Sequence, residues 1–268
     1  MHRRKLLAGS GVTLTTIIAG CTGDADDEDG NETENGDGEG PAEDTPEPDD
    51  NGEDDTDEAN EEDEQPRSDD QLLSLVDTLE DDEPLFDPDT RSFDGSGQTV
   101  TDEFSLEAGL TAVTFDHSGE GYFVITLEGQ EETLLVNEVG DVTGAAAIPT
   151  EAGDYTLEVE ADGEWEIHVG EPISPEDELR AIPVQASGTG DAVVGPVKIE
   201  DDVTVEGEHT EDGTFIVTMY DESDSAGVDA GETVFSQIEA FEGETRATHP
   251  GVIWIDVVAD GEWSLALE

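Results

Sequence analysis

The 268-residue sequence is short of positive charge, of cysteine and of long apolar runs. It has eight Lys and Arg against 74 Asp and Glu, a formal net charge of −66 at pH 7. Such a surface repels polyanions, which excludes nucleic acid and anionic membrane surfaces as partners held by charge. The one cysteine, Cys21, cannot form an intramolecular disulfide, so a folded domain must be stable without one. The uncharged stretch 6–19 is too short to span a bilayer comfortably as a helix.

The sequence also lacks the motifs of common enzyme classes. It contains no Gly-x-Ser-x-Gly elbow, phosphate-binding loop or dinucleotide fingerprint. Its five His residues do not follow a metal-ligand spacing, and His117 and His209 occupy equivalent places in a repeat described below, which favours a structural role. The shortage of nucleophile and base candidates predicts a protein that is not an enzyme. We expect no catalytic residue, no cofactor and no metal site.

The amino terminus has the pattern of an export signal. Arg3 and Arg4, followed by Lys-Leu-Leu, resemble a twin-arginine signal, and residues 1–20 are predicted to be a signal peptide. The tetrapeptide that ends at Cys21, Ile-Ala-Gly-Cys, resembles a lipobox, whose cysteine thiol receives a lipid. The alternative is an ordinary signal peptide followed by an unmodified cysteine. The resemblance implies a protein anchored at Cys21 to the outer face of the cell membrane.

Residues 21–70 are predicted to be a disordered acidic tether. Between positions 24 and 70 the chain has 25 Asp or Glu and one base, Arg67. So polar a segment cannot bury enough surface to offset its chain entropy. As a flexible coil it would extend on the order of 40 Å, by the square-root scaling of flexible linkers. Asn31 begins an Asn-Glu-Thr glycosylation sequon, which would be accessible after export.

A short helix is predicted after the tether, within a connector that covers residues 68–90. Ser68 is a suitable cap, and Leu72, Leu75, Val76 and Leu79 fall on one face of a helix over 68–80. We expect this apolar face to pack on the first domain.

Two copies of one unit follow, at 91–171 and 184–268, joined by a Pro- and Glu-rich linker at 172–183. Ala-Asp-Gly-Glu-Trp occurs at 161–165 and again at 259–263, between runs of alternating apolar residues. Two such runs joined by an Asp-Gly turn predict a β-hairpin in each copy. Trp165 and Trp263 are expected to fill the cores, together with Phe123 and Phe215, which head matching apolar runs. Self-similarity of this kind indicates tandem domains.

Short alternating strands without a helical pattern predict an all-β protein with two antiparallel sandwiches or jelly rolls. The second copy has about five extra residues, placed at 221–232. It also shows no counterpart in sequence of Leu134-Leu135-Val136-Asn137.

Over residues 71–268 there are 49 acidic and four basic residues, a net charge of −45. Repulsion on this scale opposes a compact fold in dilute buffer, whereas in molar salt the Debye length is about 3 Å. The acids spread along every strand and turn, which is typical of a surface that faces brine rather than of a dedicated cation site. Together with the export signal and the lipobox, this composition resembles an exported lipoprotein of a halophilic archaeon. The repeats resemble small β-domains of prokaryotic surface proteins, loosely of the pre-peptidase C-terminal type, which usually accompany function rather than perform it.

Two functions remain open on the sequence. The first is a binding module that displays two β-domains to a solute, a glycan or a partner protein. The second is a structural spacer or contact element of the cell envelope, and a secreted enzyme or its accessory domain is less favoured. Trp254 bears on this choice because it alternates with Ile253 and Ile255 and should face away from their core. It is predicted either to stack on a ligand or to lie between the two domains.

Overall fold

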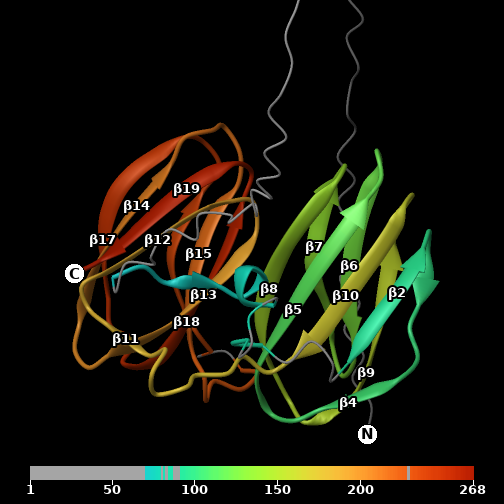
Figure 1. The fold of residues 1–268 in the computed structure, drawn as a ribbon, viewed down its shortest axis with the longest axis horizontal. Coiled ribbons are helices and arrows are strands. Elements are labelled where there is room, and N and C mark those ends of the chain that lie inside the picture. Colours follow the sequence, from blue (N-terminus) through green and yellow to red (C-terminus); the bar gives the residue numbers. More distant parts are fainter. Residues whose placement is uncertain (1–69, 80, 82–83, 87–90, 228–229) are drawn as a thin grey trace, which may run out of the picture. The chain divides into compact units, whose positions relative to one another are not determined.

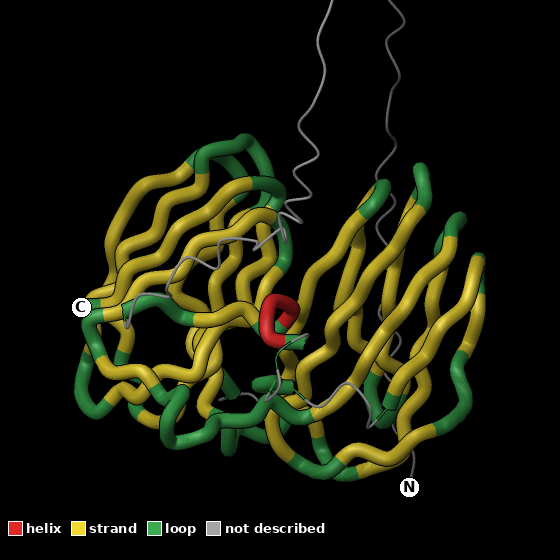
Figure 2. Tube along the Cα trace, in the orientation of Figure 1, coloured by secondary structure: helices red, strands yellow, loops and turns green. Residues whose placement is uncertain are grey.

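The computed structural model describes residues 70–79, 81, 84–86, 91–227 and 230–268, which form mainly antiparallel β-strands (Figures 1 and 2). All of them belong to one unit, residues 61–268. The strands of the first copy are β2 (Ser92–Ser96), β3 (Thr99–Val100), β4 (Phe104–Leu106), β5 (Gly109–Ser118), β6 (Tyr122–Glu128), β7 (Glu132–Val139), β8 (Val142–Thr150), β9 (Gly153–Glu160) and β10 (Glu164–Gly170). Those of the second copy are β12 (Val184–Thr189), β13 (Ala192–Ile199), β14 (Val203–His209), β15 (Phe215–Asp221), β16 (Glu232–Gln237), β17 (Phe241–Ala247), β18 (Gly251–Ala259) and β19 (Glu262–Leu267). The predicted all-β class is confirmed.

Each copy is a sandwich of two sheets with the same strand order. In the first copy the sheets are β2-β10-β5-β8 and β9-β6-β7, the latter extended by the short strands β3 and β4, which both pair with β9. In the second copy they are β12-β19-β14-β17 and β13-β18-β15-β16. Strands that follow each other in sequence are thus largely divided between the two sheets. This is the order of a jelly roll, which the alternating pattern had left open beside other sandwiches.

The repeated pentapeptide does not form the predicted hairpin. β9 pairs with β6, and β10 pairs with β5 and β2, so the turn at 161–163 carries the chain from one sheet to the other. The turn between β18 and β19 does the same in the second copy. Alternation predicts which side chains are buried but not which strand is the hydrogen-bonding partner. The buried side chains of β9 and β10 therefore face each other across the core instead of sharing one face.

Each core contains the tryptophan that the sequence predicted for it. Trp165 and Trp263 are buried, and their indole Nε1 atoms donate hydrogen bonds to the carbonyl oxygens of Gly97 (3.1 Å) and Gly190 (2.9 Å). Both rings lie over a glycine of the neighbouring strand, at Gly95 in the first copy and its counterpart in the second. A Cβ at Gly95 would lie 2.5 Å from the indole ring, so the glycine makes room for the tryptophan. Gly95 and Gly97, at the end of one strand, and the tryptophan that ends the repeated pentapeptide, on the next, are therefore two halves of one packing arrangement.

The cores also contain the predicted phenylalanines, and the second copy has a strand, β16, in the place of β7. Phe123 and Phe215 are fully buried on β6 and β15. β16 pairs with β15 as β7 pairs with β6, and a register shift occurs at the same place in both pairs. The expectation of no counterpart for residues 134–137 is thus wrong, because Phe235 takes the place of Val136 with a different side chain. The longer connection between β15 and β16, at 222–231, is confirmed.

The predicted helix at 68–80 is wrong. Its described part consists of the strand β1 (Leu73–Ser74) and a single 3₁₀ turn, η1 (Val76–Thr78). β1 pairs with β13 of the second copy, and Gln71 bridges to β12, so the segment adds to the second copy rather than only to the first. Edge-strand hydrogen bonds of that copy outweigh the weak helical pattern. β11 (Arg180–Ala181), from the linker, pairs with the same strand β13 in parallel.

A third apolar cluster joins the two copies, in addition to their two cores. It contains Trp254 and Val193 from the second copy and alanines of β5 and β8 from the first. Leu75, Leu85 and Phe86, from the segment before the first copy, complete it. β8 lies against β13 and β18, as Figure 1 also shows. The two jelly rolls are therefore packed together, edge strand on sheet face.

Candidate functional site

Trp254 lies where the two jelly rolls meet and is fully buried. Ile253 and Ile255 belong to the core of the second copy, so the predicted alternation is correct. The face that carries Trp254 is covered by the first copy and the linker, whose Ser174 Oγ accepts a hydrogen bond from the indole at 3.1 Å. An exposed stacking platform at Trp254 is therefore wrong, and the residue occupies the alternative position between the domains.

The described histidines are engaged in structural contacts. His117 and His209 are buried and stack face to face on Phe123 and Phe215, with centroid separations of 4.6 and 5.2 Å. Each also has a ring nitrogen within hydrogen-bond distance of a backbone carbonyl, 2.7 Å for His117 and 3.2 Å for His209. His249 lies 3.1 Å from a carboxylate oxygen of Asp224. The equivalence of the first two supports a shared packing role.

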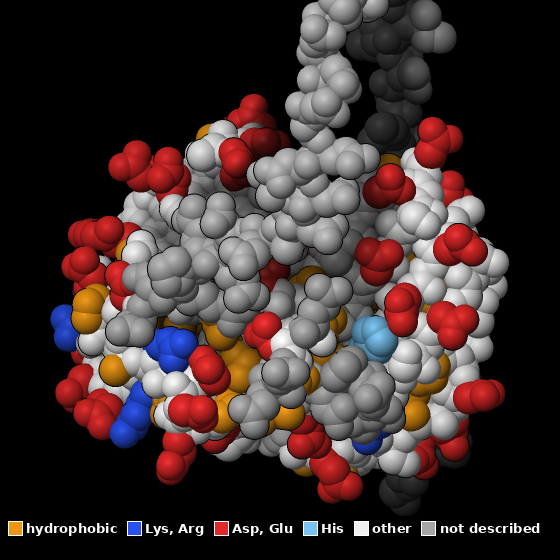
Figure 3. Space-filling view, in the orientation of Figure 1, with side chains coloured by type: hydrophobic (Ala, Val, Ile, Leu, Met, Phe, Trp, Pro, Cys, Tyr) orange, Lys and Arg blue, Asp and Glu red, His pale blue; other side chains and the backbone are white. Residues whose placement is uncertain are grey.

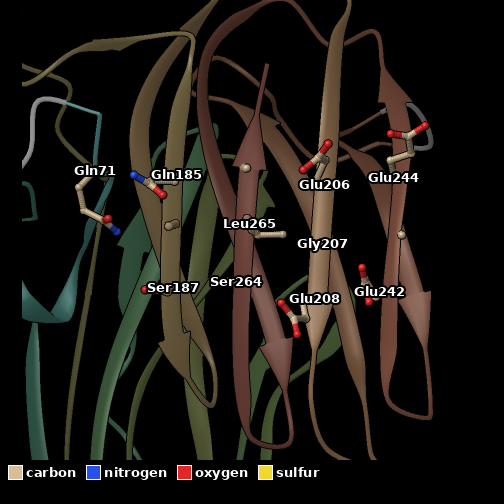
Figure 4. A pocket seen from close by; sticks show the side chains of 13 residues that line it. Gln71, Gln185, Ser187, Glu206, Gly207, Glu208, Glu242, Glu244, Ser264 and Leu265 are labelled. Atoms are coloured by element: carbon tan, nitrogen blue, oxygen red, sulfur yellow. The ribbon is translucent and has the colours of Figure 1, made fainter.

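An open groove of about 440 Å³ crosses the outer face of the β12-β19-β14-β17 sheet in the second copy (Figure 4). Because side chains alternate along a strand, the residues between the core positions of these strands point into it. One side carries amides and hydroxyls, from Gln71, Gln185, Ser187 and Ser264. The other side carries four carboxylates, from Glu206 and Glu208 on β14 and from Glu242 and Glu244 on β17.

The four carboxylates form two cross-strand pairs. Glu206 lies directly opposite Glu244, and Glu208 directly opposite Glu242. Like charges in this position destabilise a sheet. Arg246, on the same strand β17, forms an ion pair with Asp202 at 2.8 Å. The two glutamate pairs therefore concentrate acceptor oxygens on one wall of the groove, and their repulsion lowers the stability of the sheet.

The equivalent sheet of the first copy presents a different surface. Its hollow is lined by mostly polar residues of the sheet and by the segment before the first copy. The sheet contributes Thr114, Phe115, Asp116, Thr143, Glu166 and His168, and the segment contributes Val76, Asp77 and Leu79. The segment before the first copy thus lies against this sheet. At the positions of the two glutamate pairs, the first copy has Asp116 opposite Thr143 and Thr114 opposite Ala145. Only the second copy combines four carboxylates with an amide- and hydroxyl-lined wall.

The chemistry available in the groove is hydrogen bonding. Carboxylates accept, amides both donate and accept, and hydroxyls do either. None of the four described histidines lines the groove. Among the residues that the structure describes, no group of three or more His, Cys, Asp and Glu side chains is placed to hold a metal ion. Acidic side chains are scattered over the face of the molecule seen in Figure 3, as the sequence predicted.

Two buried carboxylates were missed on the sequence. Asp191 and Asp256 are almost inaccessible to solvent at the junction of the two copies. Burial raises the pKa of Asp191 to about 7, and the nearby charges of Glu138 and Asp260 contribute. Burial likewise raises the pKa of Asp256 to about 7, with a smaller contribution from Asp191. An aspartate within the apolar run of β18 was the available signal, but alternation alone placed it toward solvent.

The predicted targeting residues lie outside the described part of the chain. These are Arg3, Arg4, Cys21 and Asn31. Within the described residues, no helix has the length and apolar character needed to cross a bilayer. No family model matches the sequence, and no curated protein matches it significantly.

Proposed function

We propose that the chain is an exported, lipid-anchored surface protein of a halophilic archaeon, and that its two jelly rolls form a non-catalytic module that binds a hydroxyl-rich glycan. The observation that carries the proposal is the open polar groove of the second copy. Cys21 is the anchor, Arg3 and Arg4 belong to the export signal, and the acidic tether holds the jelly rolls away from the lipid surface.

A neutral glycan suits the groove better than a cationic ligand does. Its hydroxyls both donate and accept, which matches a lining of carboxylates, amides and hydroxyls. A cationic ligand would depend on charge attraction, which is screened beyond about 3 Å at molar salt. Hydrogen bonds to uncharged hydroxyls do not depend on that attraction. A protein that works in brine would retain affinity for a glycan.

The binding test uses the purified full-length chain in molar salt against a panel of neutral oligosaccharides and envelope polysaccharides, with calorimetry on each hit. Glu208→Ala should weaken binding at least tenfold, because it removes an acceptor from the centre of the groove. Asp116→Ala is the matched control, because Asp116 holds the same position on β5 of the first copy. Equal effects of the two changes, or no glycan bound at all, would contradict the proposal.

The anchor is tested separately. Cys21→Ser should move the protein from the membrane fraction to the medium, or leave it unprocessed. Normal processing and continued membrane association of that variant would show that Cys21 is not the site of lipid attachment.

The second candidate is a structural spacer of the envelope. The observation that favours it is the shared apolar cluster, which joins the jelly rolls into one body behind a long tether. The binding test separates the two functions, because a spacer needs no ligand in the groove.

A further inference from the structure

The contact between the jelly rolls includes two aspartates whose oxygens accept hydrogen bonds from an edge strand. β8 is the edge strand of its sheet, so the N–H groups on its free side have no strand partner. Ala147 N donates to Asp256 Oδ1 of the second copy at 2.8 Å. Ala145 N donates to the backbone oxygen of Asp191 at 3.2 Å. Two N–H groups of the first copy are thus satisfied by two residues of the second.

Both aspartate side chains are enclosed by this contact. Asp191 Oδ1 accepts a hydrogen bond from Ala259 N at 3.0 Å, which ties the turn before β13 to the end of β18. Asp256 lies two residues from Trp254 on β18, beside the apolar cluster that joins the copies. A carboxylate in such surroundings loses its hydration and regains only one backbone hydrogen bond in each case.

Within the described ranges of the chain, no charged group near Asp191 or Asp256 offsets the cost of burying their carboxylates. Glu138, from β7 of the first copy, and Asp260, from the turn between β18 and β19, both act on Asp191 as further negative charges. Tyr220 on β15 feels the charge of Asp256 and is itself held neutral by burial. Lys198 on β13 pairs with Glu200 at 3.1 Å, and Arg180 on β11 pairs with Glu178 at 2.9 Å.

We propose that the two jelly rolls are joined by a proton-linked contact, in which Asp191 and Asp256 take up protons as the copies dock and release them as the copies separate. Separation exposes both carboxyl groups to water and returns them to the ordinary behaviour of aspartate. Acid therefore favours the docked form and alkali favours the open one. This inference is independent of what the groove binds.

The pH window follows from the direction of the two shifts. The pKa of each aspartate is about 7 when the copies are docked, compared with the ordinary value of 3.8 for an aspartate exposed to water. The docked form consequently holds more protons between these values, and its advantage is complete below pH 3.8 and lost as the pH rises through 7. Each proton taken up changes the opening equilibrium about tenfold per pH unit inside the window. We expect the opening constant to rise between tenfold and a hundredfold per unit from pH 5 to pH 7, and to level off above it.

The experiment measures opening in the full-length chain at constant molar salt. Protection factors of the Ala145 and Ala147 amides, corrected for intrinsic exchange, are followed by NMR from pH 5 to pH 8.5. The indole N–H signal of Trp254, identified by its loss in Trp254→Phe, reports the same contact independently of exchange chemistry. Amides of β9, in the core of the first copy, provide the internal reference.

Asp256→Asn is the decisive variant, because its amide oxygen can still accept from Ala147 N but does not titrate in this range. It should lower the pH slope by one proton, and Asp191→Asn should do the same if the first variant fails to fold. Glu158→Gln is the matched control, at the equivalent position on β9, and should leave the slope unchanged. Equal protection at pH 5 and pH 8.5 in the wild type, or an unchanged slope with both aspartates replaced, would overturn the proposal.

Discussion

The two jelly rolls share their strand order but differ in the surfaces that they turn toward each other. On β9 of the first copy the outward positions are Thr156 and Glu158, whereas β18 of the second copy has Trp254 and Asp256. At these matched positions the second copy thus has two buried residues, one of them a tryptophan, where the first copy has two partly exposed polar residues. The face of the second copy receives the first copy. The matched face of the first copy has no apolar residue on β9, and its apolar side chains at Tyr122, Leu134 and Val139 on β6 and β7 remain exposed.

The edge strands differ in the opposite sense. β8 of the first copy has small residues where it meets the second copy, and a Cβ at Gly144 would lie 2.7 Å from the backbone oxygen of Asp191. β17, the matched edge of the second copy, carries Glu242, Glu244 and Arg246 instead. Charges on an edge strand discourage further pairing. The contact therefore joins two unlike surfaces, the small-residue edge β8 of the first copy and the face of the second copy that carries Trp254. It cannot repeat with a further copy, because β17, the matched edge of the second copy, is charged.

The largest expected effect is the response of both copies to salt. Residues 91–171 contain nineteen acidic and one basic residue, and residues 184–268 contain twenty and two, so each copy has a net charge of −18. Screening in molar salt removes most of this repulsion. Circular dichroism should show β-structure in molar salt and its progressive loss from both copies on dialysis to low salt. A sharp thermal transition that is unchanged between the two conditions would contradict this expectation.

Truncating the core tryptophans should unfold one copy at a time. Trp165→Ala and Trp263→Ala each remove a buried ring that packs on a glycine, at a cost of about 3–5 kcal/mol. Denaturant unfolding, followed by NMR signals of each copy, measures the loss. The copy that carries the change should melt first and the other should keep its own core. An equal loss in both copies would mean that they unfold as one cooperative unit.

Truncating Trp254 should separate the copies while leaving both folded. The change removes a fully buried ring and its hydrogen bond to Ser174, and we expect a cost of about 3 kcal/mol, the lower end of the range for such truncations, because the junction can open instead of leaving a cavity. Small-angle scattering and amide exchange at β8 should report the separation. Thr156→Ala, at the matched position of the first copy, should have no comparable effect. Loss of the far-UV signal in Trp254→Ala would show that the residue supports its own sandwich.

The sequence was sufficient for side-chain burial but not for strand partnership. Period-two alternation correctly placed Trp165, Trp263, Phe123 and Phe215 in cores, because burial depends only on which face a side chain occupies. It could not show that β9 and β10 belong to different sheets, because both arrangements bury the same residues. The segment at 71–79 was misjudged for a related reason. Its apolar residues fit a helix face, yet edge hydrogen bonding to β13 and β12 decides its conformation.

The candidate groove could not be predicted from the sequence, for a different reason. Its glutamates are four among 49 acidic residues of residues 71–268, and nothing local distinguishes them. Only the pairing of β14 with β17 places them opposite each other in twos. Likewise, Trp254 was correctly assigned to the outward face, but whether solvent or another domain covers that face depends on contacts far apart in sequence.

The smallest expected effect comes from converting one pair of the groove into its counterpart in the first copy. Glu242→Thr places a threonine opposite Glu208, as Thr143 lies opposite Asp116 in the first copy. There the Thr143 hydroxyl donates a hydrogen bond to the Asp116 carboxylate. Replacing a like-charge cross-strand pair with a hydrogen-bonded one should stabilise the second copy by about 0.5 kcal/mol at moderate salt, and by less at molar salt. The same change removes an acceptor from the groove, so glycan affinity should fall while the melting temperature rises. Opposite signs for stability and binding are what a functional surface is expected to show, because its repulsion is retained for recognition rather than for folding. Thr143→Glu, which installs the like-charge pair in the first copy, should destabilise that copy by a similar amount without affecting binding. If Glu242→Thr lowers stability, or if binding is unchanged, the glutamate pairs are an ordinary part of the acidic surface and the groove is not the binding site.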